Sequence, residues 1–355
     1  MHGHLESDIE EIVTRLGEEA QRFAGCRVLL CGGHGFFGRY LIAFFQHLNE
    51  RVLTTPCRLL VLDNHITSDE PALDGTARDG YRFLRQDIVQ PLTIEEPLEY
   101  VIHAAGIASP YYYRKYPLET LEVATIGTKN LLQLSSAHNK LRGFLFFSSS
   151  EIYGDPDEKH VPTKESYRGN VSCVGPRACY DESKRLGETL CTIFHESHGV
   201  PTKIVRPFNV YGPGMREADY RVLPNFASRI VARKPLHVYS SGHQTRTFCY
   251  ITDAVVGIIK TLLDGIPGQV YNVGNPVPEI SMRELVSLVE QVVGRPLQLQ
   301  LVEYPDSYPA DEPQRRCPDI SKAVLQLKYK PTVELTEGLT RFLNWALTHY
   351  TGSPS

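Results

Sequence analysis

The regular alternation of short apolar runs with amphipathic helical segments constrains the fold of this chain more than any other feature. Five runs have the length and apolar character of buried strands: RVLLC at 27–31, RLLVL at 58–62, YVIH at 100–103, GFLFF at 143–147 and KIVR at 203–206. Strands that alternate with helices form right-handed βαβ units, whose parallel sheet is covered by helices on both faces. The sequence therefore predicts an α/β protein built on a doubly wound parallel sheet.

The C-terminal part of the chain has a different texture. After about Tyr211, proline and glycine become frequent and shorter elements are expected at 236–239, 269–273, 282–293 and 297–302. We therefore predict a main domain over 26–210 and a smaller, irregular α/β lobe over 211–350, with some of the later chain crossing back. A helix over 336–350 closes the lobe, with its apolar residues on one face: Leu339, Phe342, Leu343 and Ala346.

The first 25 residues precede the first strand and have an amphipathic pattern. Ser7 and Glu10 have the spacing of a capping box. Apolar residues recur at helical intervals: Ile9, Ile12, Val13, Leu16, Ala20 and Phe23. We expect an N-terminal helix over 7–24 that packs on the main domain, and a helix that binds a partner protein is the alternative.

The composition excludes several classes of protein. The 355 residues are 42% hydrophobic and 22% charged, as in a folded globular chain. With 37 basic and 41 acidic residues the net charge is −4, which offers no basic surface for nucleic acid. No apolar run approaches the ~18 residues that a membrane helix needs. The polar N-terminal sequence MHGHLESDIEEIV lacks the features of a secretory signal.

Cysteine and histidine usage indicates a reducing compartment and no metal site. The eight cysteines, at 26, 31, 57, 173, 179, 191, 249 and 317, contain no C-x-x-C pair. We therefore expect free thiols and a cytoplasmic protein. The thirteen histidines show none of the paired spacings that are typical of metal ligands.

A glycine-rich turn follows the first strand and begins a helix. It places Gly32, Gly35 and Gly38 in a G-x-x-G-x-x-G pattern. Glycine lets backbone amides approach a pyrophosphate, and the helix N-terminus favours that anion. Asp63 ends the second strand 25 residues after the last glycine. An acid at about this spacing binds the ribose of NAD and repels the 2′-phosphate of NADP. We therefore expect NAD; a turn that binds nothing, or another phosphate ligand, is the alternative.

The residues expected to perform chemistry follow the fourth strand and occupy a later helix. Tyr180 and Lys184 form a Y-x-x-x-K pair, and residues i and i+4 share a helical face, so the ammonium can lower the pKa of the phenol. A tyrosinate of this kind takes the proton of a substrate hydroxyl while hydride leaves the same carbon. Ser149 follows the strand over 143–147, where open α/β sheets bind ligands, and is expected to share that proton with Tyr180.

Together these motifs resemble the extended short-chain dehydrogenase/reductase (NAD-dependent epimerase/dehydratase) family of nucleotide-sugar enzymes, over about residues 26–345. Besides the glycine turn and the Tyr180/Lys184 pair, the matching stretches are His103-Ala104-Ala105, Ser149–Glu151, Arg206–Asn209, Tyr211–Pro213, and Arg246 before Asp253. The resemblance implies a Rossmann domain that carries a smaller sugar-nucleotide lobe, and a homodimer formed through helices within 117–138 and 179–198. It also implies a set of cofactor-binding residues: Gly32, Gly35, Phe36, Phe37, Gly38, Asp63, Asn64, Asp87, Ile88, Ala104, Ala105, Tyr180 and Lys184.

Within that family, the sequence is most similar to the UDP-glucuronate decarboxylases, also called UDP-xylose synthases. The similarity extends over Tyr153–Pro156, Gly175–Arg185, Gln244–Phe248 and Asp311–Ile320, in addition to the strand end Ser149-Ser150-Glu151. A 4,6-dehydratase has an acid where this chain has Ser150, and a carboxylate at the position of Glu151 is not typical of 4-epimerases. Both activities remain as alternatives, as does a non-catalytic NAD-binding protein.

This similarity implies a role for each polar residue. Tyr180 is the base at the C4 hydroxyl of the sugar, Lys184 holds the nicotinamide ribose, and Ser149 bridges the hydroxyl and the base. Glu151 lies with Ser150 on the carboxylate and C5 side. Arg246 contacts the phosphates or donates a proton near C5. The expected substrate-binding residues are Tyr113, Asn209, Arg221, Asn225, Tyr239, Arg246 and Arg316, and a surface ion pair is the alternative for each arginine.

The chain departs from the decarboxylase subgroup around the expected sugar pocket. It has Ala-Ala-Gly-Ile-Ala-Ser at 104–109 in place of Leu-Ala-Ser-Pro-Ala-Ser, and Ala124 in place of a usual asparagine. The run Tyr111–Tyr113 is also unusually aromatic. A related sugar, or a different step after the same oxidation, is therefore an alternative reading.

Overall fold

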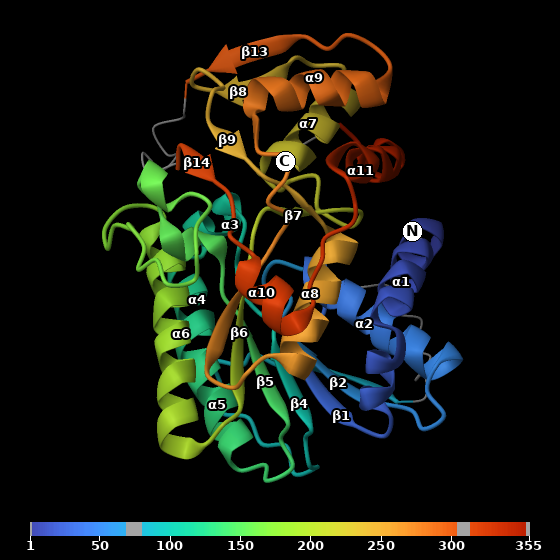
Figure 1. The fold of residues 1–355 in the computed structure, drawn as a ribbon, viewed down its shortest axis with the longest axis vertical. Coiled ribbons are helices and arrows are strands. Elements are labelled where there is room, and N and C mark those ends of the chain that lie inside the picture. Colours follow the sequence, from blue (N-terminus) through green and yellow to red (C-terminus); the bar gives the residue numbers. More distant parts are fainter. Residues whose placement is uncertain (1, 69–79, 304–312, 353–355) are drawn as a thin grey trace.

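A seven-stranded parallel sheet forms the centre of the computed structural model, which describes residues 2–68, 80–303 and 313–352. The strands lie in the order β11-β6-β5-β4-β1-β2-β3, and every neighbouring pair is parallel (Figure 1). Their bounds are β1 Arg27–Cys31, β2 Arg58–Asp63, β3 Tyr81–Arg85, β4 Tyr100–His103, β5 Gly143–Phe147, β6 Thr202–Pro207 and β11 Gln269–Val273. The five predicted strands and the Rossmann-type α/β fold are confirmed.

Helices cover both faces of the sheet. The face that carries α2 (Phe36–Arg51) and α8 (Ile251–Asp264) is opposite the face that carries α5 (Thr128–Ser136) and α6 (Ala178–His198). Successive residues of β1 point to opposite faces, as in any strand. Val28 and Leu30 join the core under α2 and α8, whereas Leu29 joins the core under α5 and α6. Within the described residues, no helix is both long and apolar enough to span a membrane.

The later chain builds a smaller body of helices and short strands beyond the carboxyl edge of the sheet (Figure 1). Its elements are β7 Val210–Tyr211, α7 Val222–Val231, β8 Leu236–Tyr239, β9 Thr245–Arg246, β10 Cys249–Tyr250, β12 Ile280–Ser281, α9 Met282–Val293, β13 Leu299–Val302, β14 Arg315–Arg316 and α11 Leu335–His349. The chain returns to the sheet at α8, β11 and α10 (Ser321–Leu327), so the later residues contribute to both parts. The predicted closing helix corresponds to α11.

Short helical segments complete the connections near the carboxyl edge. They are α3 Pro110–Lys115, α4 Pro117–Glu122, a π-helix η2 at Val123–Gly127, and the 3₁₀ turns η3 Ser150–Tyr153 and η4 Glu158–His160. The helix expected within 117–138 is thus divided into α4, η2 and α5.

The N-terminal helix begins earlier than predicted. Helix α1 spans His2–Leu16 and continues as a 3₁₀ helix, η1, over Gly17–Phe23. The capping-box prediction at Ser7 is wrong, because the residues before it are already helical and Ser7 lies inside the helix. The predicted packing on the main domain is confirmed, since Ile9, Ile12 and Leu16 are buried in the core shared with α2 and α8.

A buried carboxylate, Asp8, ties α1 to the rest of the molecule. It accepts hydrogen bonds from the hydroxyl of Tyr40 on α2 (2.8 Å) and from that of Tyr250 on β10 (3.0 Å). The guanidinium of Arg341 on α11 lies 3.5 Å away. Burial raises the pKa of Asp8 to about 6. One side chain therefore joins α1 to the sheet layer and to the C-terminal elements.

The raised pKa of Asp8 predicts a specific pH dependence of stability. Folded Asp8 binds its proton more tightly than unfolded Asp8, so this contribution to stability is present at low pH and is lost as pH rises through about 6. Asp8→Asn carries no titrating group. Its free energy of unfolding relative to wild type should therefore increase by about 2 kcal/mol between roughly pH 4.5 and pH 7.5. Urea unfolding at the two pH values measures this change, and a difference that does not vary with pH contradicts the assignment.

Candidate active site

Two cavities open where the carboxyl ends of the sheet strands meet. The first is bordered by the residues that follow β1, β2 and β4, and the second by residues that follow β5 and β6 together with the C-terminal elements. Parallel strands place their carboxyl ends at one edge, which is where open α/β sheets bind ligands.

The first cavity is lined by most of the predicted cofactor residues: Gly32, Gly35, Asp63, Asn64, Asp87, Ile88, Ala104 and Ala105. Gly32 has a φ of +81°, and a Cβ there would lie 2.5 Å from the backbone nitrogen of Ala105. A Cβ at Gly38 would lie 2.2 Å from the carbonyl oxygen of Gly32. The glycines therefore let the turn, the helix α2 and the strand end of β4 approach one another closely.

Phe36, Phe37 and Gly38 are not among the residues that line this cavity. Phe37 packs edge-to-face on Phe147 of β5, with ring centroids 5.3 Å apart. Gly38 and Phe37 therefore determine how α2 packs on the sheet. This packing directs the N-terminus of α2 toward the cavity.

The carboxylate of Asp63 is held in place by three donors. The backbone N–H groups of His34 and His65 and the hydroxyl of Ser68 each donate to it at 2.9 Å. Asn64 donates from its side chain to Asp87 at 3.0 Å. An oriented acid at the end of β2, beside the glycine turn and the N-terminus of α2, fits the adenosine ribose and pyrophosphate of NAD.

Ser149, Tyr180 and Lys184, three of the predicted catalytic residues, lie close together at the end of β5, whereas Arg246 lies on β9. Tyr180 is 5% exposed, and its ring stacks on that of Tyr113 with centroids 5.5 Å apart. Burial raises the pKa of Tyr180, and a hydrogen bond with Ser149 acts in the opposite direction. The Ser149 hydroxyl also accepts the backbone N–H of Glu151 at 3.2 Å. Ser149 thus faces the phenol and also caps η3.

Lys184 lies one helical turn after Tyr180 on α6 and is buried. Its ammonium donates to the carbonyl oxygen of Phe147 at 2.8 Å and lies 5.9 Å from the ring centroid of Tyr180. Burial lowers the pKa of Lys184 to about 8. Burial of Tyr180 outweighs the positive charges of Arg221 and Arg177, so the pKa of Tyr180 is raised in this structure.

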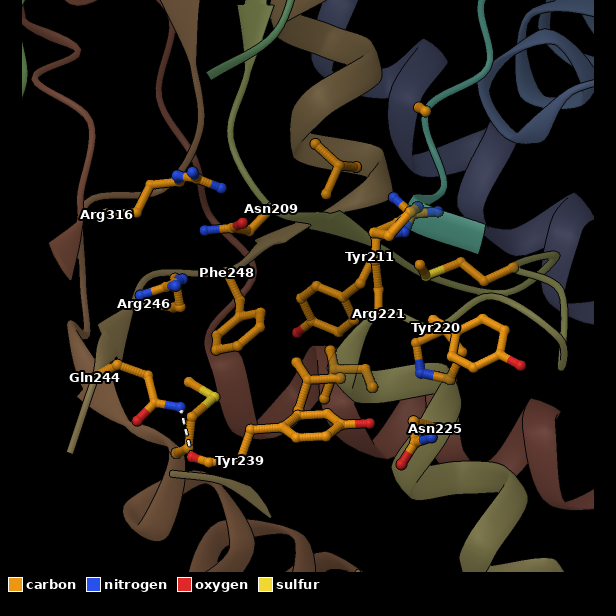
Figure 2. Close-up of a pocket in the computed structure, with 18 of the residues that line it drawn as sticks. Asn209, Tyr211, Tyr220, Arg221, Asn225, Tyr239, Gln244, Arg246, Phe248 and Arg316 are labelled. Atoms are coloured by element: carbon orange, nitrogen blue, oxygen red, sulfur yellow. Dashed lines mark hydrogen bonds between the residues drawn. The ribbon is translucent and has the colours of Figure 1, made fainter. Parts of the chain in front are cut away.

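The second cavity contains the predicted substrate-binding residues. Tyr113, Asn209, Arg221, Asn225, Tyr239, Arg246 and Arg316 all line it, together with Glu151. Figure 2 shows Arg316, Arg246 and Asn209 on one side of this space and Tyr220, Arg221 and Asn225 on the other. Ser150 is buried and is not among the lining residues.

Arg246 and Arg316 are buried, whereas Arg221 is partly exposed and forms an ion pair with Asp219, which does not line the cavity. Arg246 and Arg316 are 6% and 5% exposed, so neither is part of a surface ion pair. Arg246 donates to the carbonyl oxygen of Thr245 at 2.8 Å. Arg221 donates from Nε to Asp219 at 2.9 Å.

Glu151 lies between two guanidinium groups. Arg316 contacts it with both terminal nitrogens, at 2.8 Å for Nη2 to Oε2, and Arg177 binds the same Oε2 atom. Arg177 was missed by the sequence prediction, although it lies within the Gly175–Arg185 stretch and only three residues before Tyr180. The aromatic residues Tyr220 and Phe248, which also line the cavity, were missed too.

Comparisons with known proteins agree with this arrangement. The chain matches the family described as "NAD dependent epimerase/dehydratase family" over residues 28–274. It is 37% identical to UDP-glucuronic acid decarboxylase 1 of Arabidopsis thaliana over 319 residues, which cover 90% of this chain and 69% of that protein. It is 35% identical to UDP-glucuronic acid decarboxylase 1 of Xenopus tropicalis over 96% of this chain and 81% of that protein.

Solved structures share the fold. A UDP-glucuronic acid 4-epimerase from Bacillus cereus, in complex with UDP-glucuronic acid and NAD, is 26% identical with a TM-score of 0.73. The match covers 91% of this chain and all of that one (100%). A dTDP-glucose 4,6-dehydratase from Streptomyces venezuelae, with NAD bound, is 24% identical with a TM-score of 0.77, over 91% of this chain and 97% of that one.

The position of Tyr180 predicts the effect of removing its hydroxyl. Tyr180→Phe keeps the ring that stacks on Tyr113 but has no group to move a proton. Turnover should fall by at least ~100-fold, while NAD binds with unchanged affinity in calorimetry. Retained turnover contradicts the assignment of Tyr180 as the base.

Proposed function

This chain belongs to the NAD dependent epimerase/dehydratase family, and we propose that it decarboxylates UDP-glucuronate to UDP-xylose. The observation that supports this best is that two kinds of group stand at the end of β5. One is the Ser149–Tyr180 pair, which suits proton transfer at a hydroxyl, and the other is the arginine-bound Glu151. Relatives named UDP-glucuronic acid decarboxylase support the same reading.

The first step is oxidation at C4 of the sugar. NAD held by Gly32, Gly35 and Asp63 in the first cavity would supply the acceptor for the C4 hydride and the source of its return. Tyr180 takes the proton of the C4 hydroxyl through its hydrogen bond with Ser149. In this proposal the buried ammonium of Lys184, 5.9 Å from the ring centroid of Tyr180, favours the phenolate by its charge and binds the nicotinamide ribose.

The second step is loss of the carboxylate. Oxidation at C4 makes the sugar a β-keto acid, so the C5–C6 bond breaks and its electron pair passes to the C4 ketone oxygen as CO₂ leaves. The resulting enolate takes a proton at C5. In this proposal Glu151 and Arg246 lie on the C5 side of the sugar. They are the groups that contact the carboxylate and supply the proton at C5. Tyr180 then returns its proton to the C4 oxygen as hydride comes back.

The charge of the second cavity suits this substrate. Among the described residues that line it, the charged ones are four arginines (Arg177, Arg221, Arg246 and Arg316) and one carboxylate, Glu151. A UDP-uronate carries a diphosphate and a carboxylate, and a cavity with an excess of positive charge attracts such an anion.

The direct test is an incubation of the purified protein with NAD and UDP-glucuronate, followed by mass analysis of the nucleotide sugar. The proposal predicts a product lighter by one CO₂ that contains a pentose. A product of unchanged mass and different stereochemistry would show a 4-epimerase, and loss of water would show a dehydratase; either outcome contradicts the proposal.

We also propose that the enzyme works as a homodimer in the cytoplasm. Large apolar side chains are exposed on adjacent helices: Leu118 and Leu121 on α4, Ile126 on η2, and Leu186 and Ile193 on α6. Helices α4 and α6 run side by side (Figure 1). Such a patch suits an interface between two copies. The eight cysteines are all free, which supports a reducing compartment.

Charges placed in this patch should separate the subunits. Leu118→Glu combined with Leu186→Glu puts carboxylates into the apolar interface, so light scattering should report half the wild-type mass. The control is Leu325→Glu on α10, where Leu325 is 81% exposed outside the patch, and this variant should remain dimeric. A monomeric wild type, or a double variant that stays dimeric, contradicts the proposed interface.

A further inference from the structure

Two histidines from separate segments meet beside the acid at the end of β2. His34 lies in the glycine turn after β1, and His65 follows Asp63 by two residues. Nδ1 of His34 and Nε2 of His65 are 2.6 Å apart, so one ring nitrogen donates to the other. The two rings are nearly parallel, with centroids 4.9 Å apart and 17° between their planes. A side-chain hydrogen bond therefore joins the turn after β1 to the chain that leaves β2.

Phe83 of β3 packs against both imidazole rings. Its ring centroid is 4.6 Å from that of His34 and 5.4 Å from that of His65. His34 is buried. The described residues that line the first cavity include Asp63 but neither histidine. The histidine pair therefore supports the wall of the cavity from behind, while Asp63 lies at its surface.

The same two residues hold the carboxylate of Asp63 through their backbones. The N–H of His34 donates to Oδ2 and the N–H of His65 donates to Oδ1, each at 2.9 Å. Both carboxylate oxygens are thus bound by residues whose side chains are bonded to each other. The direction of the carboxylate depends on the spacing between these two backbone segments, and the contact between the imidazoles fixes that spacing.

The backbone of His65 needs support of this kind. Its φ is +59°, in the left-handed region that residues with a side chain rarely adopt. This conformation turns the N–H of His65 back onto the carboxylate two residues earlier. A backbone conformation of this type persists where surrounding contacts hold it. The bond to His34 is one such contact, so it also maintains the hydrogen bond from His65 to Asp63.

We infer that the His34–His65 pair positions Asp63 so that the first cavity selects NAD over NADP. An acid at the end of this strand accepts hydrogen bonds from the ribose hydroxyls of NAD and repels a 2′-phosphate. Both effects need a carboxylate that keeps its direction, because a carboxylate that rotates loses the hydroxyl contacts and turns away from the phosphate. The inference goes beyond the proposed function, because the choice of cofactor does not depend on which sugar is converted.

The test compares the binding of NAD and NADP to protein that has been freed of bound nucleotide. His34→Phe keeps a ring beside Phe83 and keeps the backbone N–H, but it has no ring nitrogen to bond to His65. Calorimetry should show that NAD binds about 3- to 10-fold more weakly, the range for losing one hydrogen bond. The affinity for NADP should change by less than about 2-fold. His34→Asn, whose amide can take the place of Nδ1, should keep most of the preference for NAD.

A second background shows whether the pair acts through Asp63. Asp63→Asn removes the negative charge and should lower the preference for NAD over NADP by more than His34→Phe does. Adding His34→Phe to Asp63→Asn should change that preference by less than about 2-fold, because the pair then has no acid to position. His65→Asn, in which asparagine tolerates a positive φ, should match His34→Phe, because each variant removes the same hydrogen bond.

General damage and loss of positioning give different results. A damaged cavity binds both cofactors more weakly by the same factor, and that result in His34→Phe overturns the inference, as does a full preference for NAD in that variant. A wild type that binds NADP as well as NAD also overturns it. Because the measured quantity is cofactor binding, these outcomes are independent of whether the protein decarboxylates UDP-glucuronate.

Discussion

The parallel alignment of the central sheet is the constraint on which both cavities depend. It brings the carboxyl ends of β1, β2, β4, β5 and β6 to one edge. The chain leaves these strands through short polar or glycine-containing segments, so the proposed phosphate-binding turn, ribose-binding acid and catalytic hydroxyls lie along the same edge. The later chain then supplies Arg221, Arg246 and Arg316 to the second cavity above this edge, together with most of its aromatic residues (Figures 1 and 2).

Burial governs the electrostatics of the site. An isolated ionised side chain is costly in a low-dielectric interior, whereas a paired and hydrogen-bonded one is tolerated. The carboxylate of Glu151 is accordingly held by two guanidinium groups, and the ammonium of Lys184 by a backbone carbonyl oxygen. The same enclosure strengthens the attraction between the arginines that line the cavity and an anionic ligand, because protein screens charges less than water does.

The sequence predicted those elements and motifs that depend on residues close together in the chain. The five strands, the glycine turn, the position of Asp63 and the Tyr180/Lys184 spacing were readable because each depends on neighbouring residues. Strand β3 was less visible, because its alternating residues are only half-buried at the sheet edge. The start of α1 was placed wrongly, since Ser7 has a capping sequence but follows residues that are already helical.

The balance of charges in the site could not be predicted from local sequence patterns. The position of Arg177 against Glu151 joins residues 26 apart in sequence, and the raised pKa of Tyr180 results from burial by segments that meet only in the fold. The resemblance to a family did locate the lobe residues, because their motifs are specific even though the contacts between them are long-range.

In the proposed reaction, one site oxidises C4, releases the carboxylate and restores C4 with the same hydride. The most direct measurement uses UDP-glucuronate with deuterium at C4, in ordinary water, and locates the label in the product by NMR. We expect UDP-xylose that retains deuterium at C4, because the hydride never leaves the site. A product without that deuterium, or a labelled product that still carries its carboxylate, would contradict it.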